Sequence, residues 1–232
     1  YFTNTHIFKA DPIIIEKLKE QNKLLKNDKL NHSYPHSWRS KAPLIYRNTP
    51  QWFISMEKNK LRDIALKSID ETVFYPPQGQ RRLRSMIETR PDWCVSRQRV
   101  WGVPLPIFIH KKTKKILVDD KVIENIASIY EKEGSDCWFS EGSKRFLGEK
   151  YNPEDYEKLT DIVEVWFDSG STHSFVLEKR QDLKWPASMY LEGSDQHRGW
   201  FHSSLLESCG TRGRAPYEAI LSHGFVVDGK GL

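Results

Sequence analysis

Apolar side chains recur every three or four residues in five stretches of the chain, which is the spacing of one face of a helix. In the first stretch Pro12 stands at the expected first helical position, because proline lacks the N–H that an interior residue must donate. In the last stretch Phe201 and Cys209 follow a polar segment in which Ser194 or Asp195 is the expected N-cap. The five predicted helices cover residues 12–25, 59–69, 78–89, 122–129 and 201–209.

Short apolar runs bounded by turn residues predict strands between these helices. The run at 189–191 leads through a glycine turn into the last helix, and residues 105–118 predict a β-hairpin with a lysine-rich tip. Strands are also expected at 43–47, 51–55, 160–165 and 219–221, and irregular structure at 32–41, 144–158, 168–171 and 226–231. Strands that alternate with helices indicate an α/β fold, in which ligands bind beyond the carboxyl ends of the strands.

Composition narrows the class of protein only slightly. The 232 residues suffice for one large or two small domains, and 38% hydrophobic with 29% charged residues is an ordinary soluble balance. No apolar run could cross a bilayer, and no secretory signal opens the chain. The net charge of +5 permits a polyanionic partner without requiring one. Three isolated cysteines form neither a disulfide framework nor a zinc quartet, and free thiols suit the cytoplasm.

Candidate chemistry is concentrated directly after the strand at 189–191. Five polar side chains fall within seven residues: Glu192, Asp195, Gln196, His197 and Arg198. Carboxylate acceptors followed by an amide suit a ligand that carries hydroxyl groups and an ammonium group. A ribose and an amino acid would both meet that description.

Three segments carry a family resemblance. Residues 190–201 read Tyr-Leu-Glu-Gly-Ser-Asp-Gln-His-Arg-Gly-Trp-Phe, which closely resembles the active-site segment of the isoleucyl-tRNA synthetases, within the class I aminoacyl-tRNA synthetases. Residues 93–104 match the pattern Trp-Cys-x-Ser-Arg-Gln-Arg-x-Trp-Gly-x-Pro, and residues 165–171 read Val-Trp-Phe-Asp-Ser-Gly-Ser. The valyl and leucyl relatives differ at residues 165–171 and 192–200, so these two segments favour isoleucine.

The resemblance implies a piece of a larger enzyme with an α/β fold. Its catalytic domain is Rossmann-like, a parallel sheet with helices, and a small α+β subdomain is inserted into it. The implied layout is an editing-insertion tail at 1–45, a catalytic-domain segment at 46–102, the inserted subdomain at 103–160 and the second half of the catalytic domain at 161–232. The His-Ile-Gly-His and Lys-Met-Ser-Lys-Ser motifs of the family are absent, so the chain is expected to be an inactive internal fragment.

The implied activity is ATP-dependent formation of isoleucyl-adenylate, followed by transfer of isoleucine to tRNA(Ile). The resemblance assigns Glu192, Gly193 and Asp195 to the adenylate and Gln196 to the polar end of the amino acid. It makes Trp166 and Trp200 walls of the side-chain pocket. The segment placed near the adenine consists of His223, Gly224 and Phe225. Mg²⁺ would accompany ATP as a substrate complex; no catalytic side chain, metal ligand or zinc is expected here, nor a membrane partner. The parent enzyme is expected to be a cytoplasmic monomer.

The tRNA contact implied by the resemblance involves Arg97, Arg99 and Trp101. Aromatic rings interleaved with cations suit unpaired nucleotides, although arginine on tryptophan is also a common cover for a small core. The arginines of the predicted helix at 78–89 also have two possible roles: they could form a solvated face or contact phosphates. A free-standing tRNA-binding module is therefore the alternative function. A hydrolytic editing unit is disfavoured, because only the tail of that insertion is present.

Several of these residues could also have a purely structural role. Trp166 and Trp200 could simply pack in a core. The segment at 168–173 contains Asp, Ser and His, but hydrolase triads are assembled from distant segments, so a triad here is disfavoured. His32 and His36 lack a third metal ligand, and serines 37 and 40 stand where some relatives carry cysteines.

Overall fold

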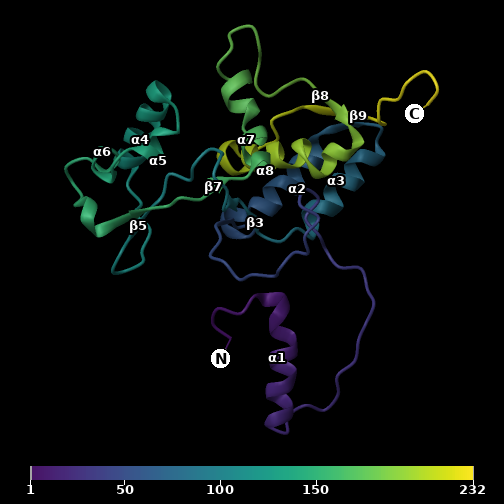
Figure 1. Cartoon of the computed structure of the whole chain (residues 1–232). Coiled ribbons are helices and arrows are strands. Elements are labelled where there is room, and N and C mark those ends of the chain that lie inside the picture. The colour runs from purple at the N-terminus through teal and green to yellow at the C-terminus, as the bar shows by residue number, and fades with distance from the viewer. Residues whose placement is uncertain (1, 232) are drawn as a thin grey trace. The chain divides into compact units, whose positions relative to one another are not determined.

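The computed structural model describes residues 2–231, and the chain divides into two compact units between Thr49 and Pro50 (Figure 1). The first unit contains helix α1 (Ile7–Glu20), none of whose residues is buried. The predicted start at Pro12 is wrong, because the proline lies inside the helix. Leu25 lies beyond the helix end and is fully exposed. The predicted strand at 43–47 is also wrong, since this segment contributes only the bridge between His36 and Pro43.

The second unit is built around a three-stranded parallel sheet. Its central strand is β9 (Ala219–His223), flanked by β2 (Val73–Tyr75) and β8 (Tyr190–Gly193). The predicted strands at 189–191 and 219–221 are confirmed, whereas β2 was not foreseen. The parallel pairing confirms the predicted α/β class, since parallel strands need helical crossovers that cover the sheet.

Helix α8 (Trp200–Arg212) lies at the centre of the second unit, where α2 (Leu61–Glu71), α3 (Gln78–Glu88) and α7 (Val165–Gly170) pack (Figure 1). Every residue from Phe201 to Cys209 is buried, so this helix has no solvent face over more than two turns. A helix buried all round belongs to the core of a larger assembly of elements.

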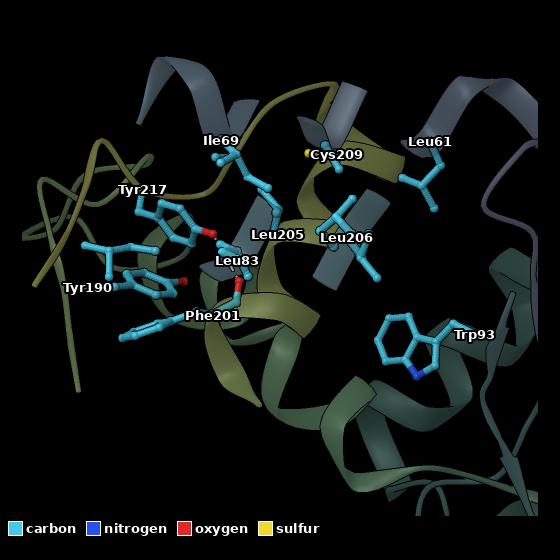
Figure 2. Close-up of a cluster of buried hydrophobic side chains, with 14 of the residues drawn as sticks. Leu61, Ile69, Leu83, Trp93, Tyr190, Phe201, Leu205, Leu206, Cys209 and Tyr217 are labelled. Atoms are coloured by element: carbon cyan, nitrogen blue, oxygen red, sulfur yellow. Dashed lines mark hydrogen bonds between the residues drawn. The ribbon is translucent and has the colours of Figure 1, made fainter. Parts of the chain in front are cut away.

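The main hydrophobic core joins α8 to the sheet and to α2 and α3 (Figure 2). Tyr190 of β8 and Tyr217 lie together at one end of this cluster, and Trp93 lies at the other. The buried hydroxyl of Tyr217 donates a 3.0 Å hydrogen bond to the carbonyl oxygen of Phe201 at the start of α8. The hydrogen bond satisfies a polar group that burial would otherwise destabilise. Core residues of α2 and α3 are Leu61, Ala65, Ile69, Leu83 and Ile87, which confirms the predicted face of α2 and the predicted helix at 78–89.

The predicted N-cap of the last helix is wrong. Ser194 and Asp195 instead open the 3₁₀ helix η4 (Ser194–Arg198), and α8 begins only at Trp200 after Gly199. The side-chain oxygen of Gln196 accepts a 2.9 Å hydrogen bond from the Trp200 N–H. Gln196 therefore satisfies one of the free N–H groups that an N-cap residue normally satisfies.

The predicted turn at 168–171 is wrong too, because this stretch continues α7 and is followed by the π-helix η3 (His173–Leu177). Close packing on α8 explains the helix. A Cβ at Gly170 would overlap the Glu207 carboxyl and would lie 3.0 Å from the Ser203 carbonyl carbon. Glycine lets the two helices approach here, and no local pattern of Asp, Ser and Gly encodes that approach.

Two antiparallel pairs connect the remaining segments of this part. Strand β1 (Phe53–Ile54) pairs with β3 (Trp93–Cys94), which confirms the strand expected at 51–55. Strand β4 (Ser96–Arg97) pairs with β7 (Ile162–Val163), confirming the strand expected at 160–165. A short 3₁₀ helix, η1 (Lys58–Lys60), precedes α2.

A second hydrophobic cluster is formed by residues 108–156. Strand β5 (Phe108–His110) pairs with β6 (Tyr156–Lys158), so the expected loop at 144–158 is wrong. The predicted hairpin at 105–118 is confirmed by the antiparallel bridge between Ile109 and Ile116 and by the Leu117 N–H, which donates to the Phe108 carbonyl oxygen. The other elements are α4 (Asp120–Glu133), as predicted, α5 (Cys137–Ser140), α6 (Ser143–Leu147) and η2 (Pro153–Asp155). None of the helices within residues 2–231 is long and apolar enough to cross a membrane.

Candidate active site

The sheet places two of the predicted nucleotide-binding segments side by side. In the parallel register Glu192 lies opposite Ser222, and Gly193 lies opposite His223. Both strands end here, so Glu192, Gly193, His223 and Gly224 lie at the carboxyl edge of the sheet. That edge is where open α/β sheets bind their ligands. Phe225, just beyond it, is 79% exposed.

The turn after β8 is organised by its own side chains. The Glu192 carboxylate accepts a 3.0 Å hydrogen bond from the Gly193 N–H. The Gln196 amide donates to the Asp195 carboxylate at 3.3 Å while its oxygen caps α8. Asp195 is exposed and Gln196 is half-buried. The Asp195 carboxylate therefore remains accessible to a ligand beyond the strand ends.

Trp200 connects three elements beside this turn. Its indole stacks on the Tyr190 ring at a centroid distance of 4.0 Å and an interplanar angle of 5°. Its Nε1–H donates a 3.0 Å hydrogen bond to the carbonyl oxygen of Ser169 in α7. Stacking and this hydrogen bond together hold the ring in one orientation.

Trp166 reaches the same region from α7. Its ring lies against Gly199, where an added Cβ would be 2.8 Å from Trp166 Cη2 and would overlap the Gln196 side-chain oxygen. The ring is 41% exposed, so it is not an ordinary core tryptophan. The structure thus brings Trp166, Gln196 and Trp200 together around Gly199, although α7 and η4 are separated by more than 20 residues in the chain.

Replacing Gly199 by alanine tests how closely this cluster is packed. The new methyl group must displace the Trp166 ring or the Gln196 oxygen that caps α8, and overpacking of this kind destabilises by about 1–3 kcal/mol. We expect thermal unfolding of Gly199→Ala at a lower temperature than wild type, with changed Trp166 fluorescence. Gly142→Ala is the matched control, because no atom lies within 4 Å of a Cβ at that position. Equal unfolding temperatures for the two variants would contradict the packing described here.

Glu164 links the Trp93–Trp101 segment to α7. Its buried carboxylate accepts hydrogen bonds from Trp93 Nε1 and from Arg97 Nη2, the latter at 2.5 Å. The Arg97 guanidinium also donates to the carbonyl oxygens of Cys94 and Ser96. Charge-assisted hydrogen bonds of this kind are the strong ones. Arg97, one of the residues assigned to tRNA, is therefore engaged within the chain.

The other two residues assigned to tRNA face solvent. Trp101 is 88% exposed, and Arg99 is exposed. Arg90, from the same segment, lies over the Trp93 ring at 5.6 Å. Here the arginine covers a packed tryptophan, which is one of the two interpretations that composition alone could not separate. The structure therefore divides this segment into a packed half and an exposed half.

The face of α8 that meets α7 carries buried ionisable groups. Burial, with a further contribution from Asp168, raises the pKa of the Glu207 carboxyl to about 9. Burial also raises the pKa of Asp168, assisted by Glu164. His202 is buried, and its pKa is lowered to about 3, first by desolvation and then by Arg90. At neutral pH Glu207 is therefore protonated and His202 is neutral.

A hydrolase triad at 168–173 is excluded by the hydrogen bonds. Ser169 donates to the Trp166 carbonyl oxygen at 3.2 Å, and Ser171 donates to the Asp168 carbonyl oxygen at 2.8 Å. The buried His173 ring has no hydrogen-bond partner within the part of the chain that the structure describes. A nucleophile and base would have to contact one another directly.

Metal-ligating side chains do not gather in the described part of the chain. Residues 2–231 contain no group of three or more His, Cys, Asp or Glu side chains that could hold an ion. All three cysteines are free. The Ser37 hydroxyl accepts a 3.2 Å hydrogen bond from the Ser40 N–H.

Several residues of the site were not found from the sequence. Glu164, His202 and Glu207 are the buried ionisable side chains around α7 and α8. Each stands in a locally ordinary context, and its partners come from distant segments. One signal was available: Glu207 and His202 interrupt the apolar face of a helix that is otherwise suited to burial, and buried polar residues of this kind call for a specific partner.

A parallel sheet with a polar turn at its carboxyl edge, next to an aromatic cluster, defines an α/β domain of the kind that binds ligands beyond its strand ends. Residues 9–232 match the family described as tRNA synthetases class I (I, L, M and V), and the chain belongs to this family.

The similar curated proteins are more specific. The chain is 80% identical over 231 residues to an isoleucine–tRNA ligase of Pelagibacter ubique (strain HTCC1062), a match that covers 100% of this chain and 26% of that protein. Isoleucine–tRNA ligases of Brucella abortus biovar 1 (strain 9-941) and Caulobacter vibrioides (strain ATCC 19089 / CIP 103742 / CB 15) are 60% and 53% identical, each over 96% of this chain. These matches cover 23% and 24% of those two proteins, so the chain spans about a quarter of the length of the relatives it matches.

Proposed function

We propose that this chain is part of an isoleucine–tRNA ligase and carries one side of its aminoacyl-adenylate site. The observation that carries the proposal is the register that sets Gly193 opposite His223, with the Trp166, Gln196 and Trp200 cluster beside it. Adenylate and amino acid would then meet at one edge of the sheet. The names of the three relatives support isoleucine as the amino acid.

The proposed chemistry is attack by the isoleucine carboxylate on the α-phosphate of ATP. This gives isoleucyl-adenylate and pyrophosphate, and the isoleucyl group then passes to the terminal ribose of tRNA(Ile). Mg²⁺ would neutralise charge on the ATP phosphates. The residues of this chain would act by binding and orienting the reactants rather than by forming a covalent bond.

Each residue predicted to bind the adenylate or the amino acid has a role in this proposal. Glu192 and Asp195 accept hydrogen bonds from ribose hydroxyls, and the backbone at Gly193 leaves room for the sugar. The half-buried Gln196 amide addresses the polar end of isoleucine, and the two indoles of Trp166 and Trp200 enclose its side chain. His223, Gly224 and Phe225 lie along the adenine. Apolar walls of this kind separate isoleucine from valine by only about 1–3 kcal/mol.

The proposed layout keeps the four segments expected from the resemblance. Residues 1–45 end the editing insertion, 46–102 and 161–232 belong to the catalytic domain, and 103–160 form the inserted α+β subdomain. The separate hydrophobic cluster of residues 108–156 supports the last assignment. We place the parent enzyme in the cytoplasm, as a monomer that takes tRNA(Ile), isoleucine and ATP.

The test is isoleucine-dependent ATP–pyrophosphate exchange by the full-length enzyme with Trp200→Ala. Losing the wall should raise KM for isoleucine and lower kcat/KM at least tenfold, because a buried aromatic contact contributes about 1.5–3 kcal/mol. Phe139→Ala is the control: this side chain is a 44% exposed aromatic of the α4–α6 region, away from the proposed pocket. Wild-type exchange that does not depend on isoleucine would refute the function; exchange unchanged in Trp200→Ala would refute the pocket.

A further inference from the structure

A small polar recess lies between α7, the start of α8 and the segment at Arg90–Trp93. Its volume is about 40 Å³. The residues that line it are Arg90, Trp93, Glu164, Trp166, Arg198, Gly199, His202 and Ser203. It adjoins the proposed amino-acid pocket, because Trp166 and Gly199 belong to both.

The recess contains buried polar atoms that no residue of the described chain satisfies. His202 is only 4% exposed; the His197 backbone is near enough to interact with its ring, and no side chain within residues 2–231 donates to or accepts from either ring nitrogen. The Nε of Arg90 is buried and unpartnered in the same sense. Buried polar groups in folded proteins almost always have partners, so these atoms indicate a polar occupant.

The charge around the recess is positive. Neither Arg90 nor Arg198 is within salt-bridge distance of a carboxylate of the described residues, although Glu164 acts on Arg90 through its charge, and both arginines lower the pKa of His202. Glu164 is the only acid in the lining, and its carboxylate is already occupied by Trp93 and Arg97. His202 is neutral, so it offers one N–H donor without adding charge. The Arg198 guanidinium, the free Nε–H of Arg90 and the buried His202 imidazole line one recess, and this set of donors suits an oxyanion.

The position of the recess identifies the source of that oxyanion. On one side it is bounded by Arg90 and Trp93, where the segment assigned to tRNA begins, and on the other by Trp166 of the amino-acid pocket. Under the proposed function the 3′ end of a tRNA has to reach the amino-acid pocket, and the recess adjoins that pocket. We propose that Arg90, Arg198 and His202 bind a backbone phosphate among the terminal nucleotides of tRNA. The inference rests on the proposed function, and it transfers the phosphate contact from Arg97 to these residues.

The experiment uses full-length enzyme and an RNA minihelix ending in the tRNA(Ile) acceptor strand. Binding is measured by fluorescence anisotropy across a salt series, for wild type and for Arg198→Gln, whose exposed side chain has no partner to lose in the described chain. We expect about tenfold weaker binding at low salt and a salt slope smaller by about 0.7, the value for one contact to a single strand. Arg180→Gln is the matched control, because Arg180 is exposed and paired with Asp182.

Neutral methylphosphonate linkages then locate the contacted phosphate. A single methylphosphonate is placed in turn at each of the last three linkages. At one of these positions it should weaken wild-type binding about tenfold and leave Arg198→Gln binding unchanged. If the methylphosphonate and the Arg198→Gln substitution weaken binding additively at all three linkages, the proposal is overturned. Competition by millimolar inorganic phosphate without such coupling would also overturn it, in favour of a free-phosphate site. Absence of isoleucine-dependent pyrophosphate exchange in wild type would refute the proposed function separately from the recess.

Discussion

Glu207→Gln is expected to raise the free energy of unfolding at pH 8 by on the order of 3 kcal/mol. Glu207 is 9% exposed within α8, and one of its carboxyl oxygens is buried without a partner among the described residues. Burial, followed by the influence of Asp168, raises its pKa from an ordinary value of 4.5 to about 9. The amide keeps the shape of the protonated acid, also both donates and accepts hydrogen bonds, and does not ionise.

The pH dependence of this effect has a definite sign. Between pH 4.5 and about 9 the folded chain keeps the Glu207 proton, while the unfolded chain releases it. The folded state binds more protons, so stability falls as pH rises through this window. Below pH 4.5 the group is protonated in both states, and its contribution is complete and constant. Glutamine removes this slope, so the variant and wild type should diverge as pH rises.

Denaturant unfolding at pH 5 and pH 8 measures the difference. Glu131→Gln on the exposed face of α4 is the matched control, and it should change stability little at either pH. A gain for Glu207→Gln that is the same at both pH values would show that Glu207 ionises normally in the folded chain. A loss at both values would show that the carboxylate has a partner that an amide cannot replace.

The second large effect is expected at Glu164. Glu164→Ala should lower the free energy of unfolding by about 3 kcal/mol, because it leaves Arg97 and the Trp93 indole N–H without their acceptor. The side chain of Glu164 is only 10% exposed, although that of Arg97 is 36% exposed, which holds the estimate at the low end for a buried pair. Glu164→Gln keeps an acceptor for Trp93 and should lose about half as much.

An exposed ion pair provides the comparison for Glu164. Glu218 pairs with Lys184 at 3.2 Å, and both side chains are more than half exposed. Glu218→Ala should therefore cost no more than about 1 kcal/mol. Equal losses in urea unfolding for Glu164→Ala and Glu218→Ala would mean that the Trp93, Arg97 and Glu164 connection does not stabilise the fold.

Helices whose apolar face meets a core were predictable from the sequence. Leu61, Ala65 and Ile69 of α2 follow the spacing of 3.6 residues per turn and are all buried. Amphipathic periodicity survives folding because one face of such a helix must leave water whatever its partner is. Helix α1, with no buried residue, lacked this constraint, and its predicted start at Pro12 was wrong.

Elements that depend on a distant partner were not predictable in the same way. Segment 144–158 looked polar and irregular, yet Tyr156–Lys158 forms a strand because β5 offers it an edge. Residues 165–170 form a helix because Gly170 fits against Glu207 and Ser203 of α8. In both cases a contact between segments far apart in the chain overrides local composition.

The same distinction between local and long-range determinants applies to the candidate site. Local sequence was enough to indicate the acidic glycine turn after β8, the aromatic residues near it and, through its motifs, the family to which the chain belongs. Tertiary structure alone decided that Gly193 lies opposite His223, that Arg97 is held by Glu164, and that a recess beside His202 is left with Arg90 and Arg198 around it. The physical reason is range. Turns, caps and periodicity act within a few residues, whereas pairing, burial and charge depend on which segments folding brings into contact.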